Sequence, residues 1–239
     1  MKKTVLSILI ICTFCSCDLF DELTNEEVIA GLKEALTIGS ETAANSASVE
    51  NGFWGNPLIR IPLPPEAQTV KEVLESPLLS TALSALNVNV ESLMSAFWVQ
   101  INRAAEEAAK GATVIFVGAV REMTIIDGFN ILKGGETAAT EYLREKTTEP
   151  LKESFTPVVR TAVETVNVTS FWTPIADIFN HPIVRNIHRL DPITPNLEEF
   201  ITERAIDGLM TLIAEQEKKI RTDPLAQVTP LLRRVFGDR

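Results

Sequence analysis

The stretch ATVIFVGAVREMTIIDGFNIL, residues 112–132, is the most apolar run of the chain once the N-terminus is set aside. Its apolar side chains follow one another too closely for a helix or a strand with one polar face. A segment that is apolar on every side must be covered by other elements. We therefore predict that residues 112–132 form the buried centre of one domain.

Within this run, residues 114–120 are rich in β-branched side chains, which favour a strand. The chain contains no second segment with matching alternation that could pair with such a strand, so we interpret the run as helical. Thr124 and Asp127 have the spacing of a helix N-cap, and Gly134-Gly135 marks a helix end. The run thus contains at least one helix start.

The flanking sequence also predicts helices. Thr24 and Glu27 have capping-box spacing, and apolar side chains recur at three- and four-residue steps over residues 90–110 and 197–220. Further helices are expected at residues 66–74, 78–86, 137–146, 148–166, 169–179 and 224–236. The predicted fold class is all-α, a single multi-helix, bundle-like domain that spans residues 24–239.

Residues 51–65, NGFWGNPLIRIPLPP, interrupt this helical pattern. Their four prolines exclude the interior of a helix and the middle of a sheet. We predict an extended, proline-rich strap that packs against the helices through Phe53, Trp54, Leu58 and Ile61. Packing is favoured over a ligand-binding loop for this segment.

The composition is that of a folded globular protein: 239 residues, of which 45% are hydrophobic and 23% charged. The formal charge is −10, and removal of a leader that holds two lysines leaves 20 basic and 32 acidic residues. Such an acidic surface repels phosphate backbones, so we expect no binding to nucleic acid.

Residues 1–16 have the pattern of a signal peptide, a short basic start and then about ten apolar residues, half of what a membrane-spanning helix needs. The run FCSC, residues 14–17, resembles the lipobox of bacterial lipoproteins, in which Cys17 would carry the lipid. We expect residues 17–23 to be the anchor and a short linker, with the domain in the periplasm. The choice between inner and outer membrane stays open. The alternative is an ordinary cleaved leader without lipid.

The usual catalytic and metal-binding side chains are scarce. All three cysteines, Cys12, Cys15 and Cys17, lie in or beside the leader, so the folded domain has no thiol for a disulfide, a nucleophile or a metal. The two histidines, His181 and His188, are separated by a helix-breaking proline. We expect no metal, no cofactor and no common catalytic triad.

Six motifs, spread over nearly all of the chain after the leader, resemble one bacterial family. They are, in order, GFWGNPLIRIPLP (52–64), NRAAE (102–106), Met123-Thr124 with Asp127, TAATEYLR (137–144), Ile220-Arg221 with Asp223-Pro224, and VFG (235–237). The family is catalogued as domain of unknown function 4197. The resemblance implies a helical envelope protein, often lipid-anchored, and supplies no activity, ligand or partner. Gly128 and Gln227 depart from the pattern, which has alanine and arginine there.

Polar side chains within and beside these motifs form a candidate binding cluster: Asn102, Arg103, Glu106, Asp127, Tyr142 and Arg144. Arg204 and Gln216 also fall on the apolar stripe of residues 197–220, where a polar group needs a partner. Either these groups satisfy one another as a buried network or they line a pocket for an anionic ligand. Taken singly, Asp127 is expected to be a cap. Arg103 with Glu107, and Glu106 with Lys110, are expected to pair on the surface.

Three functions remain open. The leading hypothesis is a lipid-anchored envelope protein that binds a small molecule or an envelope protein and catalyses nothing. The alternative is a carboxylate-dependent hydrolase of an envelope polymer, which needs two carboxylates with separated pKa values from the set Glu106, Asp127, Glu141, Asp207 and Glu215. The third is a scaffold that contacts its partner through Phe53 and Trp54.

Overall fold

The computed structural model describes residues 24–165, 168–188 and 196–236. The predicted signal peptide, Cys17 and most of the proline-spaced connector before residue 196 lie outside these ranges. The described residues form α-helices and one 3₁₀ turn, with no strand, which confirms the all-α prediction. None of the described helices is both long and apolar enough to cross a membrane.

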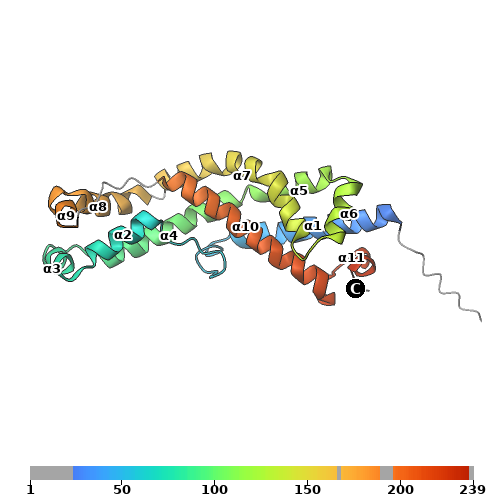
Figure 1. Ribbon diagram of the computed structural model, residues 1–239, viewed down its shortest axis with the longest axis horizontal. Helices are drawn as coiled ribbons and strands as arrows, with labels where there is room; N and C mark the ends of the chain where they lie inside the picture. Colours follow the sequence, from blue (N-terminus) through green and yellow to red (C-terminus); the bar gives the residue numbers. More distant parts are fainter. Residues whose placement is uncertain (1–23, 166–167, 189–195, 237–239) are drawn as a thin grey trace, which may run out of the picture.

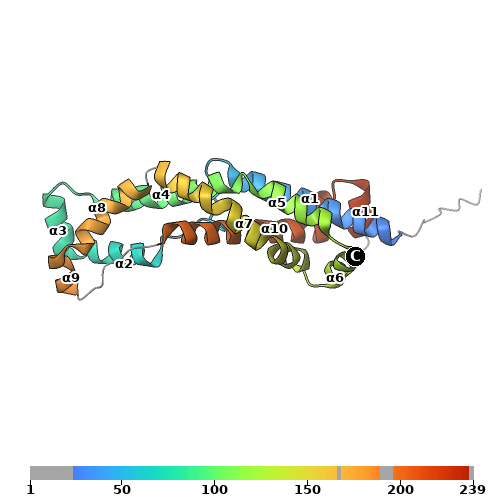
Figure 2. The same cartoon turned by 90° about the horizontal axis from the view of Figure 1, so that it is seen from above.

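The helices in chain order are α1 Asn25–Ser48, α2 Pro65–Leu74, α3 Pro77–Ala85, α4 Val90–Ala109, α5 Ala112–Glu122, α6 Ile125–Lys133, α7 Ala138–Thr165, α8 Val168–Asn180, α9 Pro182–His188, α10 Leu197–Thr222 and α11 Pro230–Phe236, with the 3₁₀ turn η1 at Pro224–Ala226. They build an elongated rod (Figure 1). One end, here the distal end, consists of α2, α3, α8 and α9; the other, the proximal end, consists of α6, η1, α11 and the start of α1 (Figure 2).

Side-chain hydrogen bonds cap α1, α6 and α10, and two of these caps, at Thr24 and Thr124, confirm predicted helix starts. Thr24 and Glu27 form a complete capping box at α1, and Thr124 and Asp127 form another at α6. The Asn196 side chain accepts the Glu199 N–H at α10, at 3.3 Å. Each bond satisfies a backbone donor that the first helical turn leaves without a partner.

The prediction that residues 112–132 are buried on every side is wrong. The run breaks at Met123-Thr124 into α5 and α6, and both helices lie on the outside of α1 and α7. Phe116 and Val120 face the core, whereas Val114 is 78% exposed and Ile126 is 73% exposed. A peripheral helix buries one face only, however apolar its sequence is. The core lies instead between α1, α4, α7 and α10.

The two helices expected at residues 137–146 and 148–166 are one continuous helix, α7. Both Pro150 and Pro157 lie inside it. Proline removes one backbone donor and disfavours the helix locally, but α7 packs along its length against α10 and α4. Tertiary packing therefore overrides the local preference for a break at Pro150.

Candidate functional site

The strap, residues 51–64, is attached to α4 through Asn102. The Asn102 side-chain oxygen accepts the Ile61 N–H at 2.8 Å, and its amide nitrogen donates to the Ile61 and Trp98 carbonyl oxygens at 3.1 and 3.0 Å. The Trp98 indole also donates to the Ile61 carbonyl, at 2.7 Å. Asn102 is fully buried, and its amide gives the strap the partners that a neighbouring strand would otherwise supply.

Glu106 forms the second attachment, one helical turn further along α4. One carboxylate oxygen accepts the N–H groups of both Phe53 and Trp54, each at 3.1 Å. The other oxygen accepts a hydrogen bond from Arg103 at 2.6 Å. The Glu106 side chain is 6% exposed. Charge-assisted bonds of this kind are among the strongest that a protein forms.

The surface pairs predicted for this helix are therefore wrong. Arg103 pairs with Glu106, and Lys110 pairs with Glu107, each at a spacing of three residues instead of four. The reason is that the strap covers Glu106 and draws its carboxylate inward. The outer nitrogen of Arg103 donates to Asn51 at 2.9 Å and lies 3.3 Å from Glu50.

The strap prediction is confirmed in part. Phe53 and Ile61 are buried against the helices as expected, but Leu58 is exposed and Ile59 is buried in its place. Residues 51–55 and 57–59 form turns, and the second turn leaves Leu58 exposed. Because Phe53 is completely buried, it cannot serve as the contact surface of a scaffold.

Beside the Arg103–Glu106 pair, a groove of about 860 Å³ opens between the end of α1, α4 and α7. We call it the α1–α4–α7 groove. Its α4 wall is polar and includes Gln100, Arg103 and Lys110, while its α7 wall includes Pro157 and Val158. The Gln100 side-chain oxygen is buried and accepts no hydrogen bond from the described residues. Of the predicted cluster, Arg103 and Glu106 lie at this groove.

Asp127 and Tyr142 lie elsewhere, in a second pocket of about 490 Å³ between α5, α6 and α7. The Thr124 hydroxyl and N–H donate to Asp127 at 2.7 and 2.9 Å and lower the pKa of its carboxyl. Burial raises the pKa of Tyr142, whose hydroxyl is 3.5 Å from the Ala119 carbonyl oxygen. The prediction that Asp127 is a cap is confirmed.

Arg144 belongs to neither pocket. It is exposed and pairs with Asp207 of α10 at 2.9 Å, and Arg204 approaches the same carboxylate at 3.5 Å. The prediction that Arg204 lies on the apolar stripe of α10 is wrong, since this side chain is half exposed. The six predicted cluster residues are therefore divided among three places on the rod.

A buried carboxylate that the prediction missed is Glu217 of α10. It accepts the N–H groups of Ala139 and Thr140 at 3.1 and 2.9 Å, and the Thr140 hydroxyl at 2.8 Å. Arg221, four residues later, donates two hydrogen bonds to it at 3.0 and 2.8 Å. Its position between Ile213 and Ile220 on the apolar stripe was the available signal.

The five carboxylates of the hydrolase hypothesis do not gather in one place. Glu106 is the buried one among them, and its oxygens are occupied by the strap and Arg103. Asp127 caps α6, and Asp207 forms ion pairs on the surface of α10. Across the described part of the chain, no group of three histidine, cysteine, aspartate or glutamate side chains could hold a metal ion.

Comparison with known proteins gives a family and no more. No curated protein matches the chain, and no solved structure matches it. The family model described as a protein of unknown function, DUF4197, matches residues 22–237. This match covers nearly the whole chain, including the strap, both buried glutamates and the groove. The chain therefore belongs to the DUF4197 family.

Proposed function

We propose that this protein is a bacterial envelope lipoprotein, anchored through Cys17, that binds an amphipathic small molecule or peptide in the α1–α4–α7 groove and catalyses nothing. The observation that carries the binding role is the groove itself, a space of about 860 Å³ lined by α1, α4 and α7. The lipobox-like run FCSC at residues 14–17 supports the anchor.

The lining of the groove favours an amphipathic ligand over a simple anion. Arg103 and Lys110 already pair with carboxylates, so neither cation is available without displacing its partner. Pro157 and Val158 offer an apolar wall, and the side chains of Gln100, Arg103 and Lys110 offer a polar one. A ligand with an apolar part and an N–H or O–H donor fits both walls.

A non-catalytic role agrees with the position of Glu106. A general acid or nucleophile needs access to the substrate, whereas the carboxylate oxygens of Glu106 already accept hydrogen bonds from two backbone N–H groups and Arg103. No observation favours the hydrolase hypothesis over binding.

The test is native mass spectrometry of the lipoprotein purified from its own cells, with Thr161→Trp as the variant. Thr161 is exposed and lines the groove, so a tryptophan there fills the groove and leaves the core intact. The matched control is Thr211→Trp, because Thr211 is also an exposed helical threonine whose hydroxyl donates to the carbonyl four residues back.

We expect a bound molecule on the wild type and on Thr211→Trp, and its loss from Thr161→Trp. Retention of the same molecule by a folded Thr161→Trp variant contradicts binding in this groove.

A further inference from the structure

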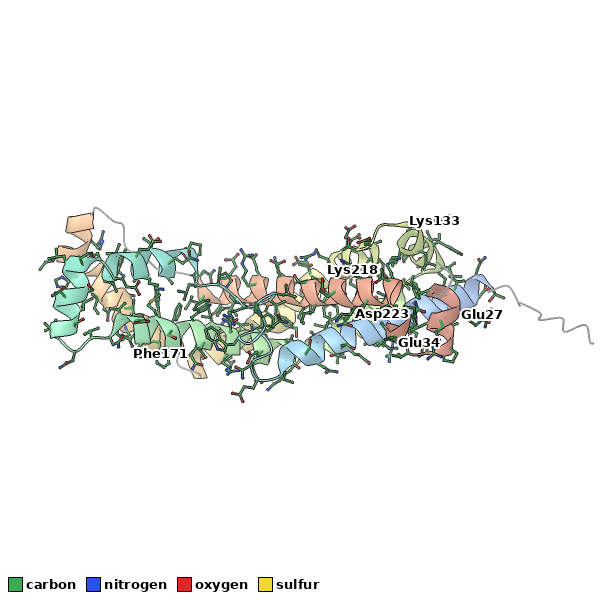
Figure 3. All side chains as sticks on the ribbon, turned by 90° about the horizontal axis from the view of Figure 1, so that it is seen from below. Glu27, Glu34, Lys133, Phe171, Lys218 and Asp223 are labelled. Carbon is green, nitrogen blue, oxygen red and sulfur yellow. The ribbon has the colours of Figure 1, made fainter. Side chains whose placement is uncertain are left out.

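The strap carries one charged side chain, Arg60, and this side chain lies against two tryptophan rings. The guanidinium carbon of Arg60 is 4.8 Å from the centre of the Trp54 ring and 6.0 Å from the centre of the Trp98 ring. The two rings are nearly perpendicular, with their centres 5.2 Å apart. Figure 3 shows the strap across the middle of the rod, between Phe171 and Glu27.

Hydrogen bonds to the backbone fix the arginine and both rings. Arg60 Nε donates to the Trp54 carbonyl oxygen at 2.6 Å. The Trp54 N–H is held in turn by Glu106, at 3.1 Å, and the Trp98 indole donates to the Ile61 carbonyl oxygen at 2.7 Å. Because these contacts exist without a ligand, a ligand that binds Arg60 does not have to order the side chain first.

The charge of Arg60 is not balanced by a carboxylate of the described residues. Arg103, Arg144 and Arg160 each form an ion pair, whereas Arg60 forms none with the described part of the chain. Its two terminal nitrogens, Nη1 and Nη2, donate to no described residue and are not buried. Glu106, the carboxylate that holds the strap, is already paired with Arg103. Both terminal nitrogens of Arg60 are therefore free for a ligand.

These groups select an oxyanion. The terminal nitrogens of a guanidinium match the two oxygens of a carboxylate or phosphate, and such charge-assisted pairs are strong. Trp54 and Trp98 are half-buried, so part of each indole ring offers apolar surface beside the anion. The formal charge of the chain, −10, opposes anions at long range, but salt screens this repulsion beyond about 8 Å, which leaves the contact with Arg60 to decide binding.

We propose that Arg60, Trp54 and Trp98 form an oxyanion site, which binds the carboxylate or phosphate group of a ligand and packs an apolar or aromatic part of it against the indole rings. None of the three residues lines the α1–α4–α7 groove, so this site is separate from the groove and does not depend on the function proposed for it.

The experiment follows the indole N–H signals of the three tryptophans by NMR in the full-length protein in detergent. Phenylacetate and phenyl phosphate are the probes, benzyl alcohol is the neutral control, and sodium chloride keeps the ionic strength constant. Trp172 serves as the internal control, because it is buried against Phe97 with the ring centres 5.1 Å apart.

The test variant is Arg60→Gln, and the matched control is Arg233→Gln. Arg233 Nε also donates to a backbone carbonyl, that of Gln227, at 3.0 Å. Like Arg60, it forms no ion pair with a described residue, but it lies over no aromatic ring of the described part of the chain. Arg233→Gln therefore removes the same charge and the same kind of backbone contact at a place without indole rings.

We expect at least one of the two oxyanions to shift the Trp54 and Trp98 signals and to leave that of Trp172 in place. The probe that does so identifies the ligand group as a carboxylate or a phosphate. Arg60→Gln should weaken this binding at least about tenfold, and Arg233→Gln should leave it unchanged.

Three results would overturn the inference. One is a wild type whose Trp54 and Trp98 signals move with neither oxyanion, which decides the matter even if Arg60→Gln fails to fold. Another is an equal response to benzyl alcohol, and the third is unaltered affinity in a folded Arg60→Gln variant.

Discussion

At the scale of single residues, two buried glutamates share one arrangement. Glu106 accepts two consecutive backbone N–H groups from the strap, and Glu217 accepts two from the first turn of α7. Each has an arginine on its own helix as its ion-pair partner, Arg103 and Arg221. A buried carboxylate is tolerated where its oxygens are fully used in this way, and both glutamates join segments that are distant in sequence.

The Glu106→Ala substitution should lower the free energy of unfolding by about 3 kcal/mol, because it removes the buried partner of Arg103 and leaves the N–H groups of Phe53 and Trp54 without their acceptor. The matched control is Glu107→Ala, which removes an exposed pair with Lys110 and should change stability by less than about 0.5 kcal/mol. Urea unfolding of both variants measures the difference. Equal losses would show that Glu106 does not fasten the strap.

Sequence patterns predicted the hydrogen bonds between residues close in sequence and missed those between distant residues. The caps at Thr24 and Thr124 were predictable because their partners lie three residues away. The partners of Glu106 and Glu217 lie 53 and 78 residues away, and no local pattern encodes such a distance. The structure places Glu106 beside Arg103 and places Arg144 on the surface with Asp207, so the six candidate residues do not form one cluster.

At the scale of elements, the strap packs closely on α10 at Gly208, where there is no space for a side chain. A Cβ atom on Gly208 would lie 2.6 Å from Phe53 Cε1 and 3.2 Å from Ile59 Cβ. Both side chains are buried and cannot move aside. Glycine in the middle of a helix costs about 1 kcal/mol relative to alanine, so its presence in α10 is explained by the close approach of the strap.

The Gly208→Ala substitution should therefore destabilise the protein by about 1–3 kcal/mol, despite the better helix propensity of alanine. Gly118→Ala in α5 is the matched control, because nothing lies within 4 Å of a Cβ atom there. That variant should gain up to about 1 kcal/mol. Opposite shifts of the two melting temperatures are expected; a gain in stability for Gly208→Ala would contradict the proposed packing.

Elements were predictable where proline, glycine and caps mark them, and less so where hydropathy alone was used. The strap followed from four prolines, and the end of α6 at Gly134 was expected. Residues 112–132 were misjudged because hydropathy does not say how many neighbours a helix has, and α5 and α6 have neighbours on one side. The prediction of two helices at residues 137–146 and 148–166 was wrong because packing holds Pro150 and Pro157 within one continuous helix, α7.

At the scale of the whole molecule, the start of α1 lies at the proximal end of the rod, and the α1–α4–α7 groove lies between the two ends. The sequence predicted an all-α domain behind a leader, but it could not predict a groove, because that space arises from three helices that meet only in the folded chain.

The account depends most on the lipid at Cys17, and metabolic labelling tests it directly. Cells that express the protein are supplied with a labelled fatty acid, and the protein is then isolated and examined for label. The wild type should carry the label and the Cys17→Ser variant should not, because the acylated sulfur is absent. A wild-type protein without label, or a Cys17→Ser variant with it, would contradict the account.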